Sequence, residues 1–365
     1  MRRRFFLISL SLAVIVNLSI LFPNLDNPAF SAKVINLKFV NYFPPPARQS
    51  KTCEEFIAEL EKRTDGRIKI RYFAGGSLLK APGIYNGVVS GIADIGFAHI
   101  EYTPGRFPVT GACELPLGYP SAWVSNQVAN DFYNKFQPKE WDGVHILWMH
   151  SSNPNVVICK KPVRKLEDLK GLTIRAPGIV GNTVAALGAT PAPTPIMEVY
   201  DAMAKGVIDG VNTPFETLKS FRFAEVAKHV TASWQVGNLY TFYVAMNKNS
   251  YNKLTPDLKE IFDRLCGEFK ERFALMWNLI DAEGKEFAEK KGVEIIELSP
   301  QEAARWKEAA APVVEKYVKD MVGKGYSEAE VKGWIEFIQE RIEYWTAKQI
   351  ELRIKSPTGP AAMRP

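Results

Sequence analysis

The sequence lacks the short motifs that mark most secreted hydrolases and nucleotide-binding enzymes. None of the patterns G-x-S-x-G, H-E-x-x-H, G-x-x-x-x-G-K-[ST] or G-x-G-x-x-G occurs. The net charge is +6, yet no run of basic residues is interleaved with aromatics, so nucleic acid is a poor candidate partner. These absences remove the common catalytic classes without excluding an enzyme, and we expect neither catalytic residues nor a cofactor.

Cysteine and histidine are scarce, and neither forms a metal-binding pattern. No two of the four cysteines form a C-x-x-C pair, which leaves a zinc ribbon or a redox motif unsupported. After export they could form a disulfide or serve as small buried hydrophobes, and the sequence does not choose between these. His145 and His150 lie five apart on an expected strand and so face opposite sides of it. We therefore expect no metal site.

The first 32 residues differ from the rest, whose composition is that of a folded globular protein. Three arginines, Arg2 to Arg4, precede an almost wholly apolar run, Phe5–Phe22, and small residues follow at Ala29–Ala32. This order predicts a secretory signal peptide over residues 1–32, cut near Ser31 or Ala32. The apolar run is long, so an uncleaved membrane anchor is the alternative.

From residue 33 to about residue 249 expected strands alternate with expected helices, and the remainder is mostly helical. Such alternation predicts α/β domains with largely parallel sheets, and 365 residues suffice for two of them. Ser327 opens a capping box and a helix that reaches about Arg353, roughly 39 Å long. Its apolar stripe could brace two domains or pair with a second subunit, so we expect a monomer or a homodimer. The tail, residues 356–365, has the composition of a disordered segment.

Arg175 stands at the end of a short expected strand. The turn Ala176–Gly178 follows, and a helical run, Val180–Leu187, comes next. In parallel sheets, ligands lie beyond the carboxyl ends of the strands. A guanidinium offers a two-pronged donor set, and the start of the helix offers free N–H groups. We therefore predict an anion site at Arg175, the alternative being an internal salt bridge.

Several blocks of the chain resemble the DctP-type solute-binding proteins of TRAP (tripartite ATP-independent periplasmic) transporters. The longest block, LEDLKGLTIRAPGIVGNTVAALGATPAPTPIMEVYDAMAKGVIDGVNTP, covers Leu166–Pro214. Others follow in the family's order along Ile35–Ile261: EFIAELEKRTDGRIKIRYFAGGSLL, GIADIGFAHIEYTPGRFPV, GACELPLGYPS and YVAMNKNSYNKLTPDLKEIF. Their order and spacing make the resemblance specific.

The resemblance implies a two-lobed α/β fold of the periplasmic-binding-protein type, with crossing strands and a long C-terminal helix. It implies a periplasmic protein that closes on a small organic acid and delivers it to a TRAP membrane permease. On this basis we expect lobe I to comprise residues 33–152 and 240–280, and lobe II to comprise residues 153–239 and 281–355. A secreted α/β enzyme acting on a carboxylate, or a receptor presenting a ligand to a signalling partner, are the competing functions.

The resemblance also places ligand-binding residues. The family's arginine in the KGLxxR strand, which pairs with the ligand carboxylate, corresponds to Arg175. In the DGxxxP turn this chain has Asn212 and Thr213 where many members have Glu-Asn. Asn212 is the better ligand candidate, because Thr213 has the alternative role of capping the helix that begins at Pro214. Sialic-acid binders carry a second arginine at the position of Asn155, so a sialic acid is disfavoured here, and Asn155 itself is a predicted ligand-binding residue.

Further candidates follow other expected strands. We predict that Phe43, His99, Phe215 and Trp234 line the site, with Tyr42, Glu101 and Tyr240 nearby. One assigned cation and aromatic walls favour a monocarboxylate with an apolar or aromatic body over a short dicarboxylate. The expectation changes if Lys80, Arg106 or Arg222 reaches the site and supplies a second positive charge.

Overall fold

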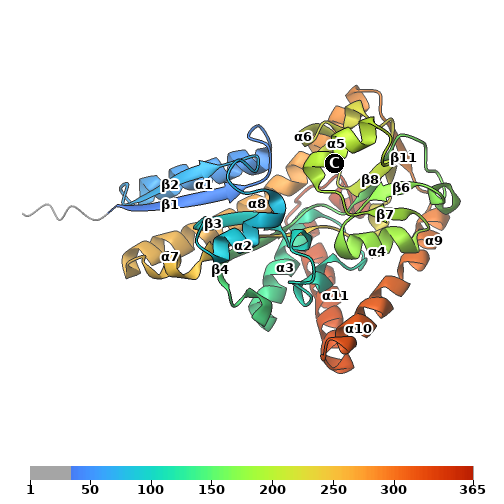
Figure 1. The fold of residues 1–365 in the computed structure, drawn as a ribbon. Coiled ribbons are helices and arrows are strands. Elements are labelled where there is room, and N and C mark those ends of the chain that lie inside the picture. The colour runs from blue at the N-terminus through green and yellow to red at the C-terminus, as the bar shows by residue number, and fades with distance from the viewer. Residues whose placement is uncertain (1–33, 365) are drawn as a thin grey trace, which may run out of the picture. The chain divides into compact units, whose positions relative to one another are not determined.

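The computed structural model describes residues 34–364, and the signal peptide predicted for residues 1–32 lies outside them. The strands form two sheets (Figure 1). The first sheet has the order β2-β1-β3-β10-β4, with bounds β1 (Ile35–Asn41), β2 (Ile68–Phe73), β3 (Ile95–His99), β4 (Val144–Ser151) and β10 (Thr241–Asn247). The second has the order β11-β9-β5-β8-β6-β7, with bounds β5 (Val156–Cys159), β6 (Thr173–Arg175), β7 (Thr190–Ala192), β8 (Gly210–Thr213), β9 (His229–Ala232) and β11 (Glu294–Glu297).

One strand in each sheet runs against all the others. In the first sheet this is β10, which pairs antiparallel with both β3 and β4. In the second it is β5, which pairs antiparallel with both β8 and β9. The remaining strands of each sheet share one direction, so their carboxyl ends meet at a common edge. This confirms the predicted α/β class with largely parallel sheets.

Helices surround both sheets (Figure 1). Around the first sheet are α1 (Arg48–Arg63), α2 (Ile84–Val89), α3 (Ala122–Phe136) and α7 (Lys248–Asn252). Around the second are α4 (Gly178–Ala186), α5 (Ile196–Ala204), α6 (Thr217–Ser220) and α9 (Pro300–Ala310). Three more complete the set: α8 (Pro256–Lys290), α10 (Pro312–Gly323) and α11 (Glu328–Glu351). None of the helices within residues 34–364 combines the length and apolarity that crossing a membrane requires.

Two crossing segments and a long helix connect the two lobes within residues 34–364. The chain passes from β4 to β5 through residues 152–155 and returns from β9 to β10 through residues 233–240. The two crossing segments are hydrogen-bonded, because Ser152 N donates to Tyr240 O (2.9 Å) and Asn155 N donates to Asn238 O (2.9 Å). The third connection is α8, which packs on α1 and β4 of the first lobe and on α6 and β11 of the second. The predicted two-lobed fold with crossing strands and a long C-terminal helix, α11 with 24 residues, is confirmed; within residues 34–364, α8 is longer still, with 35 residues.

The C-terminal helix α11 begins as predicted, since Ser327 Oγ accepts a hydrogen bond from Glu330 N (3.2 Å). Its apolar stripe packs within the chain against α3 and α10. These side chains are therefore buried without a second subunit. Residues 356–364, for which disorder was predicted, are instead ordered beside α3. Thr358 Oγ1 donates to Pro120 O (2.7 Å), and Met363 is 1% exposed. The proline- and glycine-rich composition that suggested disorder here is instead that of an irregular segment packed against the protein.

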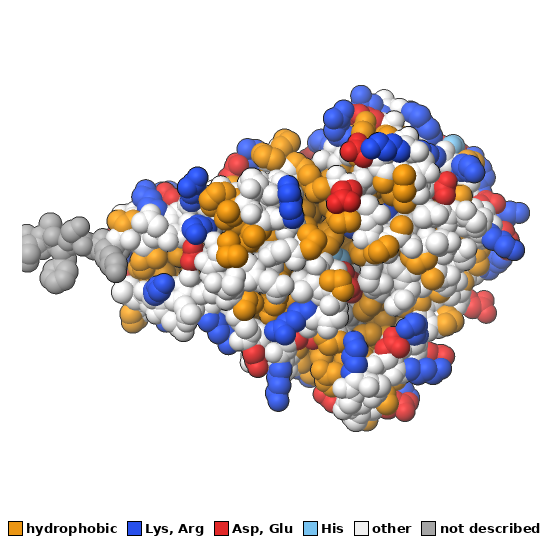
Figure 2. Space-filling view, in the orientation of Figure 1, with side chains coloured by type: hydrophobic (Ala, Val, Ile, Leu, Met, Phe, Trp, Pro, Cys, Tyr) orange, Lys and Arg blue, Asp and Glu red, His pale blue; other side chains and the backbone are white. Residues whose placement is uncertain are grey.

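The interior settles the alternative that the sequence left open for the cysteines. All four cysteines are buried and none is paired, so they serve as small hydrophobes rather than as disulfides. On the face of residues 34–364 that Figure 2 shows, basic and acidic side chains are interspersed. That face has no extended basic patch of the kind that nucleic acid requires.

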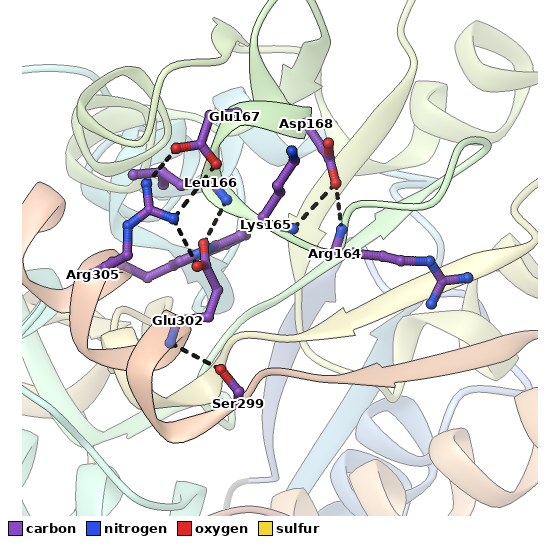
Figure 3. Close-up of polar contacts among 9 residues, drawn as sticks. Arg164, Lys165, Leu166, Glu167, Asp168, Ser299, Glu302 and Arg305 are labelled. Atoms are coloured by element: carbon purple, nitrogen blue, oxygen red, sulfur yellow. Dashed lines mark hydrogen bonds and ion pairs between the residues drawn. The ribbon is translucent and has the colours of Figure 1, made fainter.

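A polar network fixes the turn that leads into β6 (Figure 3). Glu302, in the first turn of α9, accepts a hydrogen bond from Leu166 N (2.7 Å) and forms an ion pair with Arg305 (2.8 Å). Asp168 Oδ2 accepts from Arg164 N (2.8 Å) and caps the same turn. Because this turn directly precedes β6, the network holds in place the strand that ends in Arg175.

Candidate ligand-binding site

The strand ends of both sheets line a small pocket between the two lobes. From the first lobe and the crossing segments come Tyr42, Phe43, His99, Tyr102, Ser152, Tyr240, Phe242 and Trp277. From the second lobe come Arg175, Ile196, Thr213, Pro214, Glu216, Thr217 and Phe221. The pocket therefore has one wall in each lobe.

Arg175 is the one permanently cationic side chain among the described residues that line this pocket, and it is 2% exposed. Its Nε donates to Thr194 O (2.8 Å), one Nη donates to Tyr240 Oη (3.2 Å) and the other donates to Tyr102 Oη (3.3 Å). These bonds use three of the five N–H groups of a guanidinium, so one N–H on each Nη is left. Within residues 34–364 no carboxylate pairs with Arg175. A buried charge without a counter-ion is costly, and an anionic ligand would remove that cost.

The start of α4 does not serve the pocket as the sequence suggested. Gly178 has a φ of +57°, and a Cβ there would lie 2.0 Å from Glu101 Cδ. The Glu101 carboxyl, from the other lobe, lies against the start of this helix at Gly178 and Ile179. The helix start thus faces a side chain of the protein and not the pocket.

His99 contributes an uncharged ring. Its Nε2 lies 2.9 Å from Glu114 Oε1, which also accepts from Thr241 N (2.7 Å). Burial lowers the pKa of His99 to about 3 and raises the pKa of Glu114 well above its usual range. His99 is therefore uncharged at physiological pH and adds no positive charge beside Arg175.

Aromatic rings form most of the remaining wall. Seven of the fifteen lining residues are Phe, Tyr or Trp. Tyr42 and Phe43 stack with their centroids 4.5 Å apart, and Phe242 and Trp277 stack at 5.3 Å. Stacked pairs of this kind present flat apolar faces, which suit a flat apolar ligand body.

Four of the predicted site residues line the pocket together: Arg175, Thr213, Phe43 and His99. Asn212 does not, although the sequence favoured it over Thr213. Successive side chains of β8 point to opposite faces of the sheet, and Asn212 Oδ1 instead accepts from Asn238 Nδ2 (3.2 Å). Thr213 takes the place in the pocket wall.

Three other predicted residues lie outside the pocket wall. Asn155 is fully buried on a crossing segment, and its amide has no hydrogen-bond partner among the described residues. Phe215 is 1% exposed, and the Lys285 ammonium lies 5.6 Å from its ring centroid. Trp234 lies in a short 3-10 turn beside α9. Each belongs to the packing of the lobes.

Sequence reasoning missed several lining residues. Tyr102 follows β3 by three residues, so the strand-end rule that identified His99 extends to it. Trp277 comes from the middle of α8, and nothing in the helix sequence indicates which apolar side chain reaches a ligand. Glu216 follows Thr213 by three residues and was passed over because acidic residues are common in this chain.

Two α/β lobes joined by crossing strands, with a pocket between them that holds one unpaired buried cation, define the class of two-lobed solute-binding proteins. Residues 39–320 match the model of the bacterial extracellular solute-binding protein family 7, DctP, and the chain belongs to this family. The resemblance seen in the sequence is thereby confirmed.

Solved structures agree with this assignment. A TRAP periplasmic solute-binding protein from Desulfovibrio salexigens is 34% identical, with a TM-score of 0.73, over 85% of this chain and 96% of that one. A TRAP solute-binding protein from Rhodoferax ferrireducens in complex with copurified benzoate is 26% identical, with a TM-score of 0.81, over 86% and 99%. A marine metagenome TRAP solute-binding protein specific for aromatic acid ligands is 26% identical, with a TM-score of 0.80, over 85% and 99%.

Proposed function

We propose that this protein captures an aromatic monocarboxylate between its two lobes and delivers it to a TRAP membrane permease. The main support for this proposal is the environment of Arg175. This side chain is buried, has no counter-ion within residues 34–364 and keeps one N–H on each Nη for a two-pronged contact with a carboxylate. Two relatives of similar fold support the ligand class, one in complex with benzoate and one specific for aromatic acids.

The charges of the pocket favour a single carboxylate. None of the three cations considered as a second partner lines the pocket. Arg222 pairs with Glu225 (2.8 Å), and Arg106 lies over the ring of Tyr85 (5.3 Å). A second carboxylate would be desolvated without a cation to pair with, so a dicarboxylate would gain little from entering.

The proposal extends to the ligand-lining residues, the lobes and the location of the protein. Arg175 binds the carboxylate, and Phe43, His99 and Thr213 line the pocket around the ligand. The lobes comprise residues 33–152 with 240–280 and residues 153–239 with 281–355, and they hinge at the crossing segments. Residues 1–32 direct export to the periplasm, where the protein acts without catalysis.

A direct test combines calorimetry, scattering and recovery of the ligand. Benzoate, phenylacetate, succinate, malate and glucuronate are titrated in turn into the purified protein. We expect an aromatic acid to bind with one-to-one stoichiometry and to be recovered unchanged. Small-angle scattering should then show compaction, because the lobes close on the ligand. Tight binding of succinate or malate alone would contradict the ligand class, and steady consumption of an acid by catalytic amounts of protein would favour an enzyme.

A further inference from the structure

Glu216 brings a second ionisable group to the pocket wall. It follows β8 in the turn before α6 and is 4% exposed. Its backbone N–H donates to Asp281 Oδ1 on α8 (2.9 Å). A Cβ on Gly284 would lie 2.6 Å from the Glu216 Cα, so the turn packs directly on α8. The backbone of Glu216 is therefore held in one place.

The two carboxyl oxygens of Glu216 have different surroundings. Its Oε2 accepts from Ser220 Oγ, and the Gln49 amide lies beside the carboxyl on the side of the outer cleft, while within residues 34–364 no hydrogen bond within normal limits reaches Oε1. The residue borders two cavities, the pocket that contains Arg175 and an outer cleft lined by Gln49, Lys219 and Ser220 among others. Burial raises the pKa of Glu216 to about 7, so at neutral pH the carboxyl can accept a hydrogen bond or donate one.

Glu216 and Arg175 face the pocket from different parts of the second lobe, Arg175 at the end of β6 and Glu216 in the turn after β8. They form no ion pair with each other, and Tyr42 lines the same pocket from the first lobe. A ligand whose carboxylate binds Arg175 in this pocket would therefore have Tyr42 and Glu216 in the wall around it.

We propose that Glu216 is a specificity-determining residue that binds a hydroxyl or amino group on the ring of the ligand, away from its carboxylate. This inference rests on the function proposed above. An unsubstituted ring would cover Glu216 Oε1 without offering it a hydrogen bond, which costs affinity. A second carboxylate at the same place would oppose a like charge, and dicarboxylates are rejected for that reason as well.

The test compares the affinities of four probes for the full chain: benzoate, 3-hydroxybenzoate, 4-hydroxybenzoate and terephthalate. The wild type should bind at least one hydroxybenzoate about tenfold more tightly than benzoate, as expected for one hydrogen bond to an ionisable group. Glu216→Leu should lose this preference and still bind benzoate. Glu216→Gln should bind terephthalate about tenfold more tightly than the wild type does, because the like charge is gone.

Glu283→Gln is the matched control. Glu283 lines the outer cleft and pairs with Lys219 (2.6 Å) but does not line the pocket, so this variant should keep the wild-type preferences. Equal affinity of the wild type for benzoate and both hydroxybenzoates would overturn the inference, as would a preference that survives in Glu216→Leu. If Glu216→Leu does not fold, an unchanged terephthalate affinity in Glu216→Gln overturns it. Failure of every aromatic acid to bind the wild type would refute the proposed function itself.

Discussion

Replacing Arg175 by Met separates a ligand-binding arginine from a structural one. Methionine keeps much of the length and apolar bulk of the side chain but removes the charge and every donor. The two N–H groups that Arg175 leaves unused would each form a charge-assisted bond with a carboxylate, contributing about 1.5–3 kcal/mol apiece. Their loss predicts binding that is weaker by roughly a hundredfold to ten-thousandfold.

The stability of the ligand-free variant provides the second half of the prediction. Met removes the hydrogen bonds to Thr194, Tyr240 and Tyr102, but it also removes a buried charge that has no counter-ion. These effects oppose each other, so we expect the free energy of unfolding to change by no more than about 2 kcal/mol. Breaking a buried salt bridge would instead cost about 3–5 kcal/mol.

Calorimetry with the tightest-binding aromatic acid and urea unfolding without ligand measure the two quantities. Arg175→Lys is the companion variant, and it should also bind weakly because an ammonium cannot reproduce the planar fork of the guanidinium. Near-native affinity in a folded Arg175→Met protein would refute the reasoning. So would a loss of several kcal/mol of stability in the absence of ligand.

Three further predictions follow from the site and the sequence. Tyr102→Phe removes the hydroxyl that contacts Arg175 and should weaken binding about three- to tenfold by calorimetry, whereas Trp234→Phe, outside the pocket, should leave it unchanged. Burial raises the pKa of Glu216 to about 7, so Glu216 stabilises the fold less as pH rises through that value. Ligand-free Glu216→Gln should therefore gain stability relative to wild type between pH 5 and pH 8 in urea unfolding; a constant difference would contradict this. N-terminal sequencing of envelope protein should begin near residues 30–34, and an intact Met1 would contradict cleavage.

The sequence alone was sufficient for the fold class, and it pointed to Arg175, which lines the candidate pocket. Alternating strand and helix patterns follow from the 2.0- and 3.6-residue periods of side-chain direction, which are local properties. The end of an expected strand is also visible locally. Arg175, Phe43 and His99 all lie at or just after such an end, and for this reason the sequence pointed to them.

Tertiary structure decided which neighbours share the pocket. Asn212 and Thr213 are adjacent in sequence, and only the pairing of β8 in its sheet shows that Thr213 faces the pocket. Trp277 reaches the pocket from a helix far along the chain, and Phe215 and Trp234 do not line it. The start of α4 is a plausible anion site by sequence, yet the Glu101 side chain from the other lobe lies against it. Patterns along a chain record the burial of each side chain, whereas a site depends on which side chains from distant segments meet, and packing between the lobes determines that.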